Sequence, residues 1–135
     1  MSNFDLTYLL SINRVVIIVN KIVNDQELKA LALNWLNNTP FTIKKNCLLE
    51  GRSGDDHQID FLMENAKSKL VIKVADQRRT VGTNLINKME KLSKDLGYKT
   101  LVISNKFSMQ AKHLAQRTDI MIMERDELET VLDIF

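Results

Sequence analysis

The pattern of apolar and polar positions changes near residue 40. Before that point, within 28–36, apolar residues recur at intervals of three and four, which is typical of an amphipathic helix. Asp25 is the expected N-cap of this helix, and the polar stretch 37–40 ends it. The preceding segment 1–23 is β-branched in part and is also compatible with a strand, but we interpret it as helical.

From residue 41 onward, short apolar runs bounded by turn residues predict strands. Phe41–Leu49 and Gln58–Met63 are expected to form a hairpin around the turn 51–56, which is rich in Gly and Asp. After a second turn, Lys69–Ala75 is almost continuously apolar. Such a run is typical of a central strand whose two faces are both covered.

The remainder of the chain predicts alternating helices and strands. Two antiparallel pairings followed by such alternation indicate an α/β fold, a mixed sheet flanked by helices with parallel crossovers in its second half. The chain is long enough for one domain, which we divide into a helical segment 1–40 and an α/β core 41–135. The expected elements are a helix over Val81–Leu96 ending at Gly97, a strand over Thr100–Ser104, a helix capped by Ser108, a strand over Ile120–Met123 and a helix beginning at Asp126.

Composition narrows the class of protein. An apolar fraction of 44% is sufficient for a real core. The longest β-branched run, Val15–Val19, is too short to cross a bilayer, so no membrane association is expected. Cys47 is the single cysteine, which excludes an internal disulfide and a cysteine-based zinc site and fits a reducing, cytoplasmic location.

Positive charge is concentrated in the middle of the chain. The net charge is only +2, but residues 67–106 contain ten Lys or Arg against three Asp or Glu, whereas 107–135 contain three against six. This distribution fits either a solvated helix face or a phosphate-binding face. Arg78 and Arg79, directly after the third strand, and Arg52 in the hairpin turn are the candidate phosphate contacts.

Asp60 and Lys73 form the candidate chemical site. Asp60 lies in the second predicted strand and Lys73 lies within the apolar third strand. Burying a lysine is costly unless an acid or a phosphate accompanies it, and Asp60 is the natural partner. The pair fits a phosphodiester-cleaving site, but it equally fits a plain ion pair at the end of the sheet or a lysine that extends into solvent.

Five segments follow one another in a recognisable order and spacing: Ser53–Phe61, Val71–Lys73, Arg78–Gly82, Leu96–Ala111 and Ile120–Leu132. Together they resemble the Mrr-like restriction endonuclease group of the PD-(D/E)XK nuclease superfamily. Each motif is weak alone, but their order and spacing over residues 41–135 are more specific. The resemblance implies a restriction-endonuclease-like fold and Mg²⁺-dependent cleavage of DNA, with Asp60 as metal ligand and Lys73 as catalytic lysine.

The sequence departs from this family at one decisive position. The family places Glu or Gln two residues before the lysine, where this chain has Val71, which cannot bind a metal. Gln58, on the same strand face as Asp60, is one candidate to compensate, and Glu27 in the N-terminal helix is another. Asp55–Asp56 in the adjacent turn is the third.

Three functional interpretations stay open. The first is a metal-dependent DNA endonuclease that uses Asp60, Lys73, Gln58 and Glu27, with a homodimer to cover two strands. The second is a catalytically inactive nuclease-fold protein that binds DNA or a protein partner, as in archaeal TATA-binding-protein-interacting proteins. The third is an oligomeric interaction module whose interface includes Val15–Val19.

Overall fold

The computed structural model describes residues 27–76 and 79–134. The expected helical segment 1–23, with its apolar run Val15–Val19, lies outside the described residues, and so does Arg78. No helix within the described ranges is long and apolar enough to span a bilayer.

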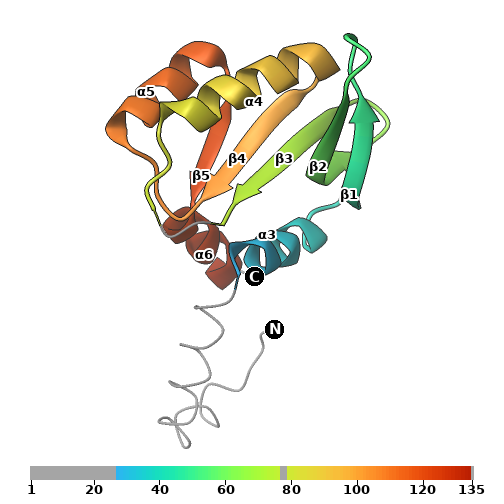
Figure 1. Ribbon diagram of the computed structural model, residues 1–135. Coiled ribbons are helices and arrows are strands. Elements are labelled where there is room, and N and C mark those ends of the chain that lie inside the picture. Colours follow the sequence, from blue (N-terminus) through green and yellow to red (C-terminus); the bar gives the residue numbers. More distant parts are fainter. Residues whose placement is uncertain (1–26, 77–78, 135) are drawn as a thin grey trace, which may run out of the picture.

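The described elements follow the predicted order. A helix precedes a three-strand meander, and helices then alternate with strands to the C-terminus (Figure 1). The third strand has the predicted bounds, and the other boundaries shift by a few residues at most. The elements are α3 (Leu28–Asn37), β1 (Thr42–Glu50), β2 (Asp56–Glu64), β3 (Lys69–Ala75), α4 (Thr83–Leu96), β4 (Lys99–Ser104), α5 (Met109–Thr118), β5 (Met121–Glu124) and α6 (Arg125–Ile134).

The five strands form one mixed sheet in the order β1-β2-β3-β4-β5. β1 and β2 are antiparallel, as are β2 and β3, whereas β3–β4 and β4–β5 are parallel. The prediction of antiparallel strands followed by parallel crossovers is therefore confirmed. β3 is the central strand, and it joins the antiparallel half of the sheet to the parallel half.

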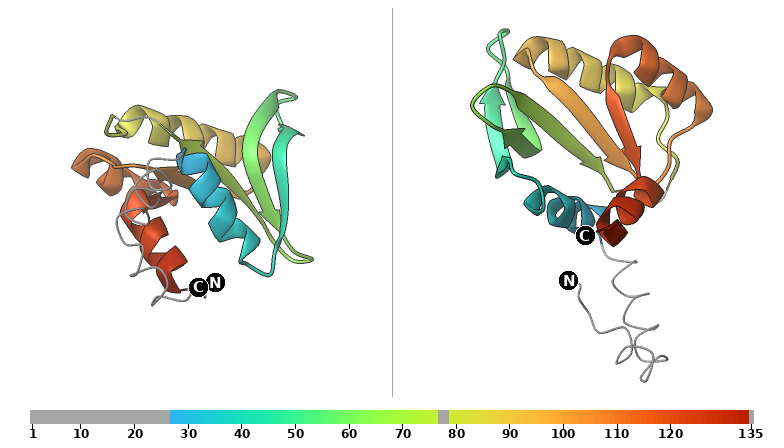
Figure 2. Two further views of the ribbon diagram at one scale, coloured as in Figure 1. Left: turned by 90° about the horizontal axis from the view of Figure 1, so that it is seen from below. Right: turned by 180° about the vertical axis from the view of Figure 1, so that it is seen from behind.

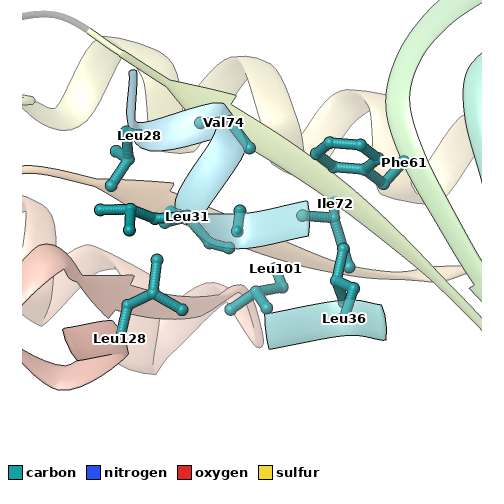
Figure 3. Packing of buried hydrophobic residues seen from close by; sticks show 10 residues of the cluster. Leu28, Leu31, Leu36, Phe61, Ile72, Val74, Leu101 and Leu128 are labelled. Atoms are coloured by element: carbon teal, nitrogen blue, oxygen red, sulfur yellow. The ribbon is translucent and has the colours of Figure 1, made fainter. Parts of the chain in front are cut away.

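Helices cover both faces of the sheet, which explains the apolar run Leu70–Ile72 and Val74 in β3. α4 and α5 lie on one face, and α3 and α6 lie on the other (Figure 2). Val71 and Ile72, neighbours on β3, are both fully buried and belong to different clusters. Figure 3 shows the cluster on the α3 and α6 side, to which α3 contributes Leu28 and Leu36, α6 contributes Leu128 and β3 contributes Ile72.

α3 begins at a different residue from the predicted one. Its N-cap is Glu27 rather than Asp25, which lies outside the described residues, and Glu27 makes no side-chain capping bond. Instead, the amide of Leu28 donates to Oδ2 of Asp76 at 2.9 Å. An acid beyond the end of β3 thus satisfies one of the unpaired amides of the helix, a long-range contact that no local capping pattern could reveal.

α4 also begins later than expected, at Thr83 rather than Val81. Val81 forms a parallel bridge with Phe107, because its amide donates to Lys106 and its carbonyl accepts from Ser108. This bridge joins the loops that follow β3 and β4. The expected helix ends elsewhere are confirmed, since Gly97 adopts a left-handed conformation with φ 76° and Ser108 caps α5 through the amide of Ala111.

The last turn of α4 holds the β1–β2 turn through Asp95. Its carboxylate accepts hydrogen bonds from the amide and the hydroxyl of Ser53, both at 2.8 Å, and from Nε2 of His57 at 2.6 Å. The carboxylate lies over Gly51, where an added Cβ would come within 1.9 Å of Oδ2. His57 is half-buried, because it pairs with an acid from a distant helix.

These donors lower the pKa of Asp95 from its ordinary 3.8 to about 2, with the His57 hydrogen bond the largest cause and the two Ser53 hydrogen bonds next. An acid whose pKa is lowered on folding adds stability above its ordinary pKa and loses that contribution as the pH falls through the folded value. The attachment of the turn to α4 should therefore weaken as the pH falls from about 4 to about 2, the interval between the ordinary and the lowered pKa of Asp95.

The first prediction concerns the core. Leu36→Ala removes a fully buried side chain and should lower the free energy of unfolding by about 2–5 kcal/mol, since it leaves a cavity. Leu48→Ala is the matched control, because Leu48 on β1 is 61% exposed. Urea unfolding measures both, and equal losses in the two variants would contradict this packing.

The second prediction concerns Asp95→Asn. This variant should be less stable than the wild type at neutral pH, and the difference should disappear as the pH falls from about 4 to about 2. Urea unfolding at a series of pH values measures the difference. Asp55→Asn, at an exposed position in the same turn, should leave the pH profile unchanged. Parallel profiles for the wild type and Asp95→Asn down to pH 2 would refute the role of Asp95.

Candidate functional site

The candidate site lies at a fork where β2 and β3 separate. Their antiparallel pairing runs from Glu64–Lys69 to Phe61–Ile72 and then stops. Beyond it, β2 continues beside β1, while β3 continues beside β4. Asp60 and Lys73 are the first residues past the fork on their respective strands, so both side chains lie where the two strands diverge.

β1 is distorted opposite this fork. Its register with β2 passes from Lys45–Phe61 to Cys47–Ile59 and skips Asn46. Asn46 has φ 50°, in the left-handed region that Asn tolerates better than most residues. The regular pairing of β2 is thus interrupted on both sides next to Asp60.

Asp60 is bound from three directions. Its Oδ2 accepts a hydrogen bond from the amide of Val74 at 2.8 Å and lies 3.8 Å from Nζ of Lys73. Its Oδ1 lies 3.1 Å from Nζ of Lys29, on α3. The expected proximity of Asp60 and Lys73 is confirmed. The carboxylate also accepts the amide hydrogen of Val74, for which the β2–β3 pairing provides no backbone acceptor.

Lys73 is less buried than its apolar strand suggested. Its side chain is 41% exposed, whereas that of Asp60 is 16% exposed. The reason is that Lys73 lies at the fork, where β2 no longer covers β3. The desolvation cost expected for a lysine in a central strand is therefore reduced, and the ammonium group is accessible to a ligand in solution.

Lys29 is a site residue that the sequence did not predict, as are Lys88 and Lys91 of α4. Lys29 follows Leu28, which is fully buried, and its own side chain is 39% exposed. The amphipathic pattern of the helix predicted only that Lys29 faces solvent. Placing it required knowing that α3 packs beside the fork. Two ammonium groups and one carboxylate give the fork a net positive charge.

A small cavity of about 90 Å³ adjoins the fork, between β2, β3 and α4. Three of the predicted site residues, Gln58, Asp60 and Lys73, line it together. Lys88 of α4 joins them, and Val71 contributes an apolar wall. The cavity is smaller than a typical pocket for an organic ligand, so this site suits a contact with an extended molecule better than enclosure of a small one.

A second hollow of about 340 Å³ continues along α4 toward the β1–β2 turn. It shares Lys88 and Leu92 with the first cavity and adds Lys91 and His57. We call the two hollows together the β2–α4 groove. The groove therefore runs from the fork to the Asp95 contact, with Lys73, Lys88 and Lys91 along it.

The remaining predicted residues lie away from the fork. Glu27 is an exposed N-cap and does not line either hollow of the β2–α4 groove. Arg79 is exposed in the loop before α4. Arg52 lies at the other end of α4, where its guanidinium Nη2 would be 2.8 Å from a Cβ on Gly97. Asp55, in the hairpin turn, is exposed and its amide donates to the hydroxyl of Ser53.

The described residues do not fit a divalent metal ion. Mg²⁺ and its relatives require several oxygen ligands, with carboxylates among them. Within 27–76 and 79–134, no group of three or more His, Cys, Asp or Glu side chains converges to hold a metal. Asp60 already binds Lys29 and the amide of Val74, and Val71, at the family's second ligand position, is fully buried and apolar.

Ser53, His57 and Asp95 do not form a nucleophilic triad either. A triad requires the serine hydroxyl to bind the histidine, which then binds the acid. Here both Ser53 and His57 bind Asp95, and no hydrogen bond between described residues joins Ser53 to His57. The cluster attaches the turn to α4 and leaves the fork as the candidate site.

Solved structures with similar folds were found by comparison. AF1548, a protein of unknown function, aligns with a TM-score of 0.66 and 20% identity over 78% of this chain and 63% of its own. Can2 from Sulfobacillus thermosulfidooxidans, in complex with cyclic tetra-adenylate, aligns with a TM-score of 0.59 and 16% identity. The alignment covers 77% of this chain and 33% of Can2. A repair endonuclease from Pyrococcus abyssi aligns with a TM-score of 0.51 and 14% identity. The alignment covers 73% of this chain and 47% of the endonuclease.

This chain spans less than two thirds of each of these three proteins. At such low identities the likeness shows a shared fold alone. A search of curated proteins found no match. The profile of the restriction endonuclease family Mrr_cat matches residues 23–132, a stretch that includes α3 as well as the core predicted from the resemblance. The chain therefore belongs to the Mrr_cat restriction endonuclease family and has a nuclease fold.

Proposed function

We propose that this chain binds DNA along the β2–α4 groove and does not cleave it. The observation that carries this proposal is the state of Asp60. In a metal-dependent nuclease this carboxylate would be directed at a cation together with a second acid. Here it lies between two lysines and a backbone amide, and Val71 supplies no ligand.

The lysines along the groove are the proposed contacts to a phosphate backbone. Lys29 and Lys73 flank Asp60 at the fork, and Lys88 and Lys91 are exposed on α4. Phosphate contacts from lysine supply most of the affinity in sequence-independent binding of DNA. Membership of a restriction endonuclease family supports DNA as the ligand.

The length of α4 suggests the size of the contact. Fourteen helical residues extend about 20 Å, or roughly six base pairs of a duplex. In this proposal Lys73 contacts phosphate near the fork, and Lys88 and Lys91 contact the same strand farther along. Arg79 and Arg78 extend the contact before α4. Arg52 reaches DNA only if the duplex passes the far end of the helix.

Two alternatives are decided by the same experiments. A Mg²⁺-dependent endonuclease would cleave DNA with Asp60 as metal ligand and with Gln58 or Glu27 as compensating ligands. A protein partner in place of DNA would leave the chain without measurable affinity for a duplex. The homodimer and the cytoplasmic location stay predictions from the sequence.

The third prediction is that Lys73→Ala and Lys88→Ala each weaken binding to a fluorescein-labelled duplex about tenfold and reduce its salt dependence by about one counterion. Fluorescence anisotropy at several salt concentrations measures both quantities. Lys99→Ala is the matched control, because Lys99 is exposed at the opposite end of the sheet. Equal losses in all three variants, or no DNA affinity at low salt, would refute the proposed groove.

The fourth prediction is that the wild type leaves supercoiled plasmid intact in Mg²⁺ and in Mn²⁺. Asp60→Asn should bind DNA more tightly than the wild type, because the variant loses a negative charge but keeps an oxygen that accepts from Val74. Plasmid nicking and anisotropy measure the two effects. Metal-dependent nicking by the wild type that Asp60→Asn abolishes would establish the endonuclease instead.

A further inference from the structure

The contact between Lys29 and Asp60 is the closest ion pair at the fork. Nζ of Lys29 lies 3.1 Å from Oδ1 of Asp60, whereas Lys73 lies 3.8 Å from Oδ2. Since Oδ2 also accepts from the amide of Val74, each carboxylate oxygen has a partner from within the protein. A metal ion at this carboxylate would have to displace Lys29.

α3 holds Lys29 in this position through its own packing. Leu28, next to Lys29, is fully buried, and its amide is bound by Asp76 at 2.9 Å. Leu31 and Leu36 anchor the same helix in the core (Figure 3). Lys29 therefore projects from a fixed helix, and less entropy is lost when it pairs with Asp60 than in an exposed pair between two mobile side chains.

We infer that Lys29 is a built-in counterion that replaces a divalent metal at Asp60. The ammonium group neutralises the carboxylate, so that Lys73 remains available to bind a phosphate group without a metal to screen Asp60. DNA binding at the fork is then independent of divalent cations. The part of this inference that concerns DNA rests on the proposed function, whereas the part that concerns metal exclusion does not.

The reasoning depends on charge and on ligand count. A lone carboxylate beside a phosphate repels it, and a nuclease overcomes this repulsion with a divalent cation. In this chain the same repulsion is removed by an ammonium group on a neighbouring helix. An ammonium ion neutralises charge but cannot activate water as a metal does, which fits binding without cleavage.

The fifth prediction tests metal exclusion directly. Lys29→Glu removes the counterion and adds a carboxylate beside Asp60, so the variant should bind Mn²⁺ at least about tenfold more tightly than the wild type. Titration of Mn²⁺ followed by electron paramagnetic resonance measures the affinity. Adding Asp60→Asn to Lys29→Glu should abolish the gain, which locates the ion at this carboxylate.

A neutral variant separates the effect of removing the positive charge from the effect of adding a ligand. It also keeps the inference testable if Lys29→Glu does not fold. Lys29→Gln removes the ammonium group without adding a carboxylate and should bind Mn²⁺ at least about threefold more tightly than the wild type. Circular dichroism confirms that each variant is folded. If the wild type binds Mn²⁺ at Asp60 as tightly as Lys29→Gln and Lys29→Glu do, Lys29 does not exclude metal and the inference is overturned.

The DNA measurements give a second, separable result. Wild-type affinity for a duplex should be the same in EDTA as in Mg²⁺ after correction for ionic strength, whereas Lys29→Glu should require Mg²⁺. A wild type that needs Mg²⁺ to bind DNA would overturn the inference but not DNA binding itself. A wild type without DNA affinity would overturn the proposed function, while the Mn²⁺ titration would still decide whether Lys29 excludes metal.

Discussion

The fork between β2 and β3 depends on one carboxylate. Past the last β2–β3 pair, the backbone of β3 has no partner on that side, and Asp60 provides one by accepting from Val74. The same side chain connects α3 to the sheet through Lys29. A buried or half-buried amide without an acceptor costs about 1–3 kcal/mol, so the acid stabilises the fold whether or not the chain performs chemistry.

This double role explains how the fold tolerates an incomplete nuclease signature. Val71 is fully buried between the sheet and α4, where an apolar side chain contributes packing that an acid would not. Asp60 binds the amide of Val74 and the ammonium group of Lys29, whereas Val71 only packs in the core. The fold therefore requires an acid at position 60 but not at position 71. The family and its fold thus accommodate a buried valine at this position of β3.

The sequence predicted the fold well, because its signals are local or periodic. The apolar run of β3, Gly97 and Ser108 each indicated their element through conformational preferences that the structure bears out. The Asp60–Lys73 pair was also predictable, since the hairpin register brings the two residues together. The sequence could not place Lys29 or Asp95, because both act across more than thirty residues of chain through helix packing that has no local signature.

Two carboxylates attach β2 to its neighbours, one in the middle of the strand and one at its start. Asp60 connects the fork to α3 and β3, and Asp95 connects the turn beyond β2 to the end of α4. The separation between the start of β2 and the end of α4 is thus set by Asp95 and His57 before any ligand arrives. In the proposed complex with DNA, this end of the groove would need little ordering on binding, which lowers the entropic cost of association.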